Sequence, residues 1–198
     1  MEPISNTRTV KLLPLFRSEN QAKLLTALVL SGKPLSVGEL AKYANIGHST
    51  ALHALNTLVV SGILSSKEEG RKHLFTLDIE GKLLEIITDL VNYTYGPKDI
   101  ITESFLSADY IKSAYIYGSW AARYNQVPGP VPNDIDLIIV GSKLKAEDKN
   151  NFENKLDILE NKLFRDINPH FVSKEDWETE SSEFIKKIKN SPLLIIKG

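Results

Sequence analysis

Apolar residues recur every three to four positions through the first half of the chain, which is the spacing of one helical face. This pattern predicts helices over 20–31, 36–43 and 48–61, the first and third of which end at glycines. Two short apolar runs then flank the polar stretch 68–72, so we expect a β-hairpin there. A longer helical pattern covers 79–95.

The pattern changes after Gly96-Pro97, a dipeptide typical of a domain boundary. Beyond it, short apolar strands alternate with helices. The expected strands are 114–117, 135–140, 166–172 and 193–196, and the expected helices are 100–106, one from 119, 146–164 and one or two after 174. We therefore predict an α+β protein with a first domain at 1–95 and a second, α/β domain with a small mixed sheet at 96–198.

Composition narrows the class of protein. The 198 residues are 42% hydrophobic and 25% charged, which is ordinary for a soluble globular protein. The chain has no apolar run near the roughly 20 residues that a membrane helix needs, and no signal-peptide pattern. The absence of cysteine excludes disulfides, thiolate metal sites and a cysteine nucleophile. We expect a cytoplasmic protein with no membrane partner.

Net charge gives no strong indication of a partner. The formal charge is −1 for the whole chain, with about +1 on residues 1–95 and −2 on the remainder. This is too faint a polarity to mark the first domain as a basic, nucleic-acid-binding one.

The densest chemical signal lies between residues 114 and 140. Gly118 lets the chain turn sharply after an apolar strand, and Ser119 suits the start of a helix. A proline-rich stretch, 126–132, is too rich in proline for helix or central strand. Asp134 and Asp136 follow at the start of the next strand, and a spacing of two places both carboxylates on one face.

Two like charges on one face are costly unless something positive joins them. Carboxylate oxygens at this spacing suit Mg²⁺ or Mn²⁺. The turn at Gly118 and Ser119 offers backbone N–H groups and a hydroxyl to a phosphate, and Arg123 lies four residues later on the same helical face. Together with Asp134 and Asp136, these residues predict a site for a metal ion and a triphosphate.

This pattern resembles the minimal members of the nucleotidyltransferase superfamily of DNA polymerase β. The resemblance rests on Gly118, Ser119, Arg123, Asp134 and Asp136, in that order and in matching strand, turn and helix surroundings. It implies a nucleoside triphosphate as ligand or substrate, with Mg²⁺ bound by the two aspartates. It also implies a third acidic residue on a later strand, which helps to bind metal and activates the attacking hydroxyl.

The third acidic position is where this chain departs from the family. Asn168 falls at that place, and an amide carries no charge and is no base. Asp166 lies two residues earlier and faces the same way in a regular strand. The catalytic candidates are therefore Asp134 and Asp136, with Asp166 and Asn168 as alternatives for the third. The binding half of the site is more complete than the catalytic half.

Three helices followed by a hairpin form a winged helix-turn-helix. Residues 15–80 resemble the ArsR-type regulators through short signatures spread along the segment. These are Leu40-Ala41, the turn at Ile46-Gly47, Leu55, Leu58, Gly62-Ile63-Leu64 and Gly70-Arg71. The resemblance implies double-stranded DNA as a partner and a homodimer formed through the helix at 79–95.

The DNA contacts would come from the exposed side of the third helix and from the wing. The candidates are His48, Ser49, His53 and Asn56 on the helix, and Arg71 and Lys72 in the wing. The helix itself carries no Arg or Lys, and Leu52 occupies a place where a polar residue is common. A winged helix that makes only protein contacts is therefore the alternative.

Three functions remain open from the sequence. The first is a nucleotide-responsive transcription regulator that binds DNA as a dimer. The second is an active nucleotidyltransferase that moves NMP from NTP to a hydroxyl of a protein, an RNA or a small molecule, as in toxin–antitoxin-like systems. The third is a scaffold with a degenerate pocket.

Overall fold

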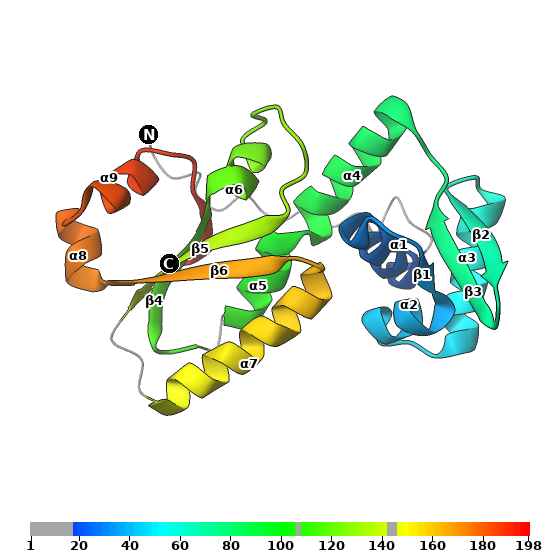
Figure 1. The fold of residues 1–198 in the computed structure, drawn as a ribbon, viewed down its shortest axis with the longest axis horizontal. Coiled ribbons are helices and arrows are strands. Elements are labelled where there is room, and N and C mark those ends of the chain that lie inside the picture. The colour runs from blue at the N-terminus through cyan, green and yellow to red at the C-terminus, as the bar shows by residue number, and fades with distance from the viewer. Residues whose placement is uncertain (1–17, 106–107, 142–145) are drawn as a thin grey trace. The chain divides into compact units, whose positions relative to one another are not determined.

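A computed structural model describes residues 18–105, 108–141 and 146–198, which form two compact units that meet in sequence at Gly96 and Pro97 (Figure 1). Residues 1–17 of the predicted first domain lie outside the described residues, as does Leu106 at the end of the predicted helix 100–106. Each unit has its own sheet and its own core.

The first unit contains four helices and three short strands among the described residues. They are α1 (Glu19–Ser31), β1 (Leu35–Ser36), α2 (Val37–Ala44), α3 (His48–Val60), β2 (Leu64–Glu69), β3 (Lys72–Leu77) and α4 (Gly81–Tyr95). The strands form an antiparallel sheet in the order β1-β3-β2. Three helices with a hairpin in this order are a winged helix, so the predicted helices and hairpin are confirmed, and β1 is an addition.

Local capping explains why the helices begin where they do. The Ser36 hydroxyl accepts from the Glu39 N–H at 3.4 Å, while the Glu39 carboxylate accepts from the Ser36 N–H at 2.8 Å. This reciprocal capping box satisfies two backbone donors at the start of α2. Ser18 caps α1, and Gly32 ends it in the left-handed conformation that a glycine adopts without strain.

Large aliphatic side chains on one face of each helix fill the core of the first unit. Leu24 and Leu28 from α1, Leu40 from α2 and Leu55 from α3 are at most 1% exposed, and Phe75 of β3 closes the core from the sheet. Burial of each such side chain contributes about 1.5–3 kcal/mol to folding. The core therefore fixes the polar side of α3 on a rigid frame.

The wing is tighter than the sequence predicted. Glu69 lies opposite Lys72 and Glu68 opposite His73, so only Gly70 and one further residue form the turn instead of the predicted 68–72. Gly70 has a φ of 62°, which two-residue hairpin turns require at such a position. Glu69 and Lys72 are the last pair of the ladder.

Helix α4 is buried along only part of its length. Val91 is fully buried, but Leu83 is 54% and Ile86 52% exposed. The first turns of α4 therefore present an apolar surface that the described residues of this unit do not cover.

The second unit surrounds a four-stranded sheet. Its elements are α5 (Pro97–Phe105), β4 (Ile111–Tyr117), α6 (Gly118–Tyr124), β5 (Asp134–Gly141), α7 (Ala146–Leu163), β6 (Asp166–Ser173), α8 (Lys174–Thr179), α9 (Glu183–Lys189) and β7 (Leu194–Lys197). The strand order is β6-β5-β4-β7, with β5 and β6 parallel and the other pairs antiparallel. The predicted mixed sheet is confirmed, and Pro169 is tolerated because β6 is an edge strand of this sheet.

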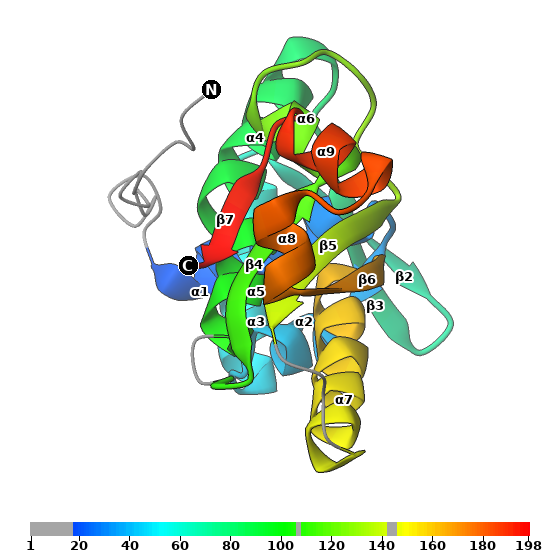
Figure 2. The same ribbon diagram turned by 90° about the vertical axis from the view of Figure 1, so that its left-hand side faces the viewer.

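Helices cover both faces of this sheet (Figure 2). On one face, the Phe152 ring of α7 lies 5.7 Å from Phe105 of α5 and 5.0 Å from Phe171 of β6. On the other face, Trp177 of α8 stacks on Tyr115 of β4 at 5.3 Å. The protein is thus an α+β chain, and no helix in the described ranges is long and apolar enough to cross a bilayer.

Candidate functional site

The turn between β4 and α6 lies close to the carboxylate of Asp136. Gly118 has a φ of 68°, and a Cβ atom at this position would lie only 2.6 Å from Asp136 Oδ2. Any side chain here would displace that oxygen. Two features therefore favour glycine here, the left-handed backbone conformation and the close approach of Asp136.

Asp134, Asp136 and Asn168 meet at the start of the parallel pair β5 and β6. Asn168 lies opposite Asp136 in the register, and its side-chain amide donates to Asp134 Oδ2 at 3.0 Å and to Asp136 Oδ1 at 3.4 Å. The two carboxylates therefore share one face of the sheet and converge on one point. The amide NH₂ lies between them, where a cation shared by the pair would also lie.

The surroundings of this cluster disfavour the ionised form of Asp136. Burial raises the pKa of Asp136, and the neighbouring Asp134 carboxylate raises it further, while the Asn168 hydrogen bond acts in the opposite direction. Burial and then the Asp136 charge also raise the pKa of Tyr117, which lies opposite Asp136 on β4. A cation at this point would relieve the repulsion.

Asp166 does not complete a set of three carboxylates. It is the first residue of β6 and lies opposite Asp134 in the register. Among the described residues, however, no three acidic or histidine side chains come close enough to hold one metal ion. The described residues therefore do not bring Asp166 together with Asp134 and Asp136 as a set of three carboxylates, and the side chain beside the two aspartates is that of Asn168.

Ser119 and Arg123 lie on α6, which starts directly after β4. Ser119 is exposed at the second residue of the helix. The Arg123 guanidinium donates a hydrogen bond to the carbonyl of Val127. It also packs closely on Gly129, since a Cβ atom on that glycine would lie 2.1 Å from Arg123 Nη1. Arg123, expected to bind a phosphate, thus contacts the proline-rich loop 126–132.

A second arginine, Arg165, contacts the other end of this loop. The sequence analysis did not predict its role. Arg165 Nε donates to the Pro132 carbonyl at 3.0 Å, and burial lowers the pKa of Arg165. Its position directly before Asp166, at the start of a strand, was the available signal. Arg123 and Arg165 together place the loop that leads into Asp134.

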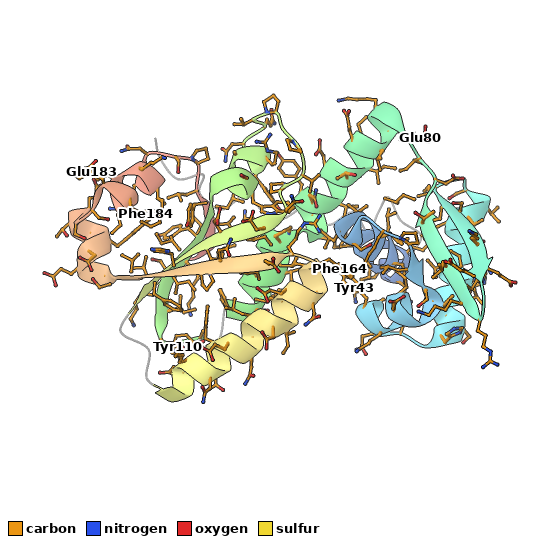
Figure 3. The ribbon with its side chains drawn as sticks, viewed as in Figure 1. Tyr43, Glu80, Tyr110, Phe164, Glu183 and Phe184 are labelled. Atoms are coloured by element: carbon orange, nitrogen blue, oxygen red, sulfur yellow. The ribbon has the colours of Figure 1, made fainter. Side chains whose placement is uncertain are left out.

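Aromatic side chains lie on the same face as the carboxylates and were also missed. The Phe184 ring extends from α9 (Figure 3), 4.6 Å from His170 and 6.2 Å from Tyr117. His170 follows Asn168 by two residues on β6, so it shares its face of the sheet. Phe184 is 40% exposed, which leaves ring surface for contact with another molecule.

The winged helix keeps its polar candidates on the surface. Six of them are exposed: His48, Ser49, His53, Asn56, Arg71 and Lys72. In the described part of the chain, no hydrogen bond or ion pair engages their side chains. Lys67 on β2 is exposed as well and adds a third basic residue to the wing, which the sequence reasoning did not include.

Comparisons with protein-family models and with curated proteins found no match. Among solved structures, reduced HlyU from Vibrio cholerae N16961 is 24% identical, covering 42% of this chain and 84% of that one, with a TM-score of 0.36. AdcR from Streptococcus pyogenes is 21% identical, covering 48% and 71%, with a TM-score of 0.36.

A third similar structure is a fragment of Mb0332 from Mycobacterium bovis, described as a homodimeric winged helix-turn-helix DNA-binding domain. It is 16% identical, covers 46% of this chain and 74% of that one, and has a TM-score of 0.32. Similarities of this strength concern the fold alone. The winged-helix assignment therefore rests on the order and pairing of the elements themselves.

Proposed function

We propose that this protein is a DNA-binding transcription regulator whose second unit binds a nucleoside triphosphate with Mg²⁺. The observation that carries the DNA-binding part is the exposed polar side of α3 beside a basic wing. Both lie on a frame whose core is closed, so they are held in a fixed relation to each other.

The spacing on α3 suits reading of bases in the major groove. Ser49, His53 and Asn56 are separated by four and three residues, which places them along one side of the helix. Asn pairs with adenine through two hydrogen bonds, and Ser bonds to several base edges. Since α3 lacks Arg and Lys, phosphate contacts fall to Arg71 and Lys72 in the wing.

A homodimer is part of the proposal. Leu83 and Ile86 leave an apolar surface on the first turns of α4, and a second copy of this surface would bury it. Two winged helices would then address half-sites about 34–36 Å apart, one turn of DNA. Sedimentation of Leu83→Glu with Ile86→Glu should give a monomer where the wild type gives a dimer. The same change at Lys82, also exposed on α4, should not affect assembly.

DNA binding is tested by a mobility shift with the DNA upstream of the protein's own reading frame, against random DNA of equal length. Ser49→Ala with Asn56→Ala should remove most of the preference for the specific fragment, at about 1–3 kcal/mol for each lost base contact. Asn151→Ala with Asn154→Ala, two exposed residues of α7, is the matched control. Equal binding of both fragments by the wild type would contradict the proposal.

Nucleotide binding by the second unit is supported by the convergence of Asp134 and Asp136 beside Gly118. Carboxylate oxygens are the ligands that Mg²⁺ prefers. The Asn168 NH₂ faces both carboxylates, and a flip of this amide would present its carbonyl oxygen as a neutral third ligand. The residues present thus fit the cation, which would neutralise phosphate charge near Gly118 and Ser119. A neutral amide in the third position cannot accept the proton of an attacking hydroxyl, which favours binding without transfer.

Calorimetry with ATP, GTP, CTP and UTP in Mg²⁺ tests this part. We expect saturable heat for at least one nucleotide, and its loss in Asp134→Ala with Asp136→Ala but not in Asp157→Ala, an exposed residue of α7. Labelled NTP incubated with cell extract tests transfer. Label on a protein or RNA band that disappears in the double variant would establish a transferase and overturn the binding-only reading.

A further inference from the structure

Three rings, those of Tyr117, His170 and Phe184, form an aromatic group that borders the carboxylate cluster. The Phe184 ring lies 4.6 Å from the His170 ring and 6.2 Å from the Tyr117 ring. Tyr117 lies opposite Asp136 in the register of β4 and β5. His170 lies two residues beyond Asn168 on β6, which is about 7 Å along the strand and on the same face. The aromatic group and the carboxylates therefore share one surface.

Phe184 keeps part of its ring accessible on this surface. Its two ring contacts have interplanar angles of 87° and 47°, so neither neighbour is stacked parallel to it. Phe184 is 40% exposed, and His170 is exposed beside it. Trp177 on the same face differs, because it stacks on Tyr115 at an angle of 22° and Lys189 Nζ lies 5.0 Å from its ring centroid. Phe184, rather than Trp177, therefore has ring surface for a further planar group.

The polarity of this surface changes from one end to the other. Asp134 and Asn168 are exposed at the carboxylate end, and His170 and Phe184 are exposed at the aromatic end. A ligand that covers both ends needs a charged part and a planar part a short distance apart. A nucleoside triphosphate has this form, because one ribose joins its phosphates to its base. An apolar side chain of a protein partner would match the aromatic end alone.

We propose that the base of the bound nucleotide stacks on Phe184 and that the site therefore prefers purine to pyrimidine nucleotides. This inference rests on the proposed function, under which Asp134 and Asp136 hold the metal ion and the phosphates. Bases stack on aromatic side chains through their π faces. The two fused rings of a purine offer a larger face than the single ring of a pyrimidine. Phe184 is thus a residue that determines specificity and lies apart from the proposed metal ligands.

Calorimetry of the full chain with ATP, UTP and inorganic triphosphate, each with Mg²⁺, tests the base contact, because inorganic triphosphate has no base. The wild type should bind ATP more tightly than UTP. Phe184→Ala should weaken ATP roughly 5- to 100-fold, UTP less, and inorganic triphosphate by no more than about twofold. Retained binding of inorganic triphosphate shows that the variant is folded. Phe184→Trp, which keeps an aromatic face, should retain ATP binding.

Phe171→Ala is the matched control. Phe171 is 46% exposed and adjacent to His170 in β6, so its side chain points to the other face of the sheet. This variant should bind ATP as the wild type does.

Two results would overturn the inference and leave the proposed function intact. One is a wild type that binds UTP as tightly as ATP. The other is a Phe184→Ala variant that weakens ATP and inorganic triphosphate equally or weakens neither. If the wild type binds none of the three ligands, the proposed nucleotide binding is wrong and the base contact is wrong with it.

Discussion

The polar side of the winged helix and the carboxylate cluster of the second unit use their side chains in opposite ways. Ser49, Asn56 and Arg71 are exposed and engage no described neighbour, whereas Asp134 and Asp136 converge on the amide of Asn168. A surface proposed to read DNA needs hydrogen-bonding groups that are available for the partner. Two like charges held together need a partner inside the protein even before a ligand arrives.

The two regions should therefore respond to different conditions. Under the proposed function, contacts from the wing to phosphates would release counterions and weaken with ionic strength. The carboxylate cluster should respond to pH and, if it binds the proposed cation, to Mg²⁺, because its cost lies in the close approach of two negative charges. The following predictions separate these responses, from the largest expected effect to the smallest.

Removal of the basic pair of the wing should have the largest effect. Arg71→Ala with Lys72→Ala should lower DNA affinity about 10- to 100-fold and reduce the slope of log K against log salt by about two, one per lost phosphate contact. Fluorescence anisotropy at several salt concentrations measures both. Lys162→Ala with Lys187→Ala, exposed residues of α7 and α9, controls for net charge. An unchanged slope would show that the wing does not touch phosphate.

A side chain at Gly118 should disturb the carboxylate cluster. Gly118→Ala should cost about 1–2 kcal/mol for the left-handed backbone and more for the displacement of Asp136. Gly32→Ala is the matched control, since its φ of 61° is similar and a Cβ there meets nothing within 4 Å. Urea unfolding measures both variants. Both tryptophans, Trp120 and Trp177, lie in the second unit, so their fluorescence follows Gly118→Ala specifically, and circular dichroism follows Gly32→Ala. Equal losses would show that Asp136 moves away at no cost.

A third carboxylate should make folding depend on Mg²⁺. Asn168→Asp replaces the amide donor by a like charge, and we expect a loss of about 1–2 kcal/mol without divalent cations. Added Mg²⁺ should restore much of this loss, and the melting temperature against Mg²⁺ concentration measures it. Asn168→Ala, which removes the donor without adding charge, should show no comparable recovery. If the two variants respond alike, Asp134 and Asp136 do not converge as described.

The pH dependence should be the smallest effect. Because burial raises the folded-state pKa of Asp136 above its unfolded value, its favourable contribution is complete below about pH 4 and is lost as the pH rises through the folded pKa. Asp136→Asn should therefore gain stability relative to the wild type between about pH 4 and 7. The gain should be less than about 1 kcal/mol, since the group is partly exposed. Urea unfolding across this range checks it, and parallel curves would contradict it.

Features set by neighbours in the sequence were predictable. The apolar stripes placed the helices of the first unit, and the spacing of Asp134 and Asp136 placed both carboxylates on one face. Each of these depends on residues at most a few positions apart.

Features set by distant neighbours were not predictable. The two-residue strand β1 exists only through its pairing with β3, and the Arg123 guanidinium turns toward Val127 because the proline-rich loop returns to it. The amide of Asn168 bridges two aspartates only because β6 lies parallel to β5 and in this register. No local pattern in the sequence predicts such an alignment.

Because Asp136 pairs with Asn168, the hydrogen bonds of the cluster depend on the register between β5 and β6. A shift of one residue would bring Ile167 or Pro169 opposite Asp136, and those side chains belong to the other face. The aspartates would then lose their shared donor at once, without any change in their own strand. A ligand whose binding shifted the register of β6 would therefore break the hydrogen bonds from Asn168 to Asp134 and Asp136.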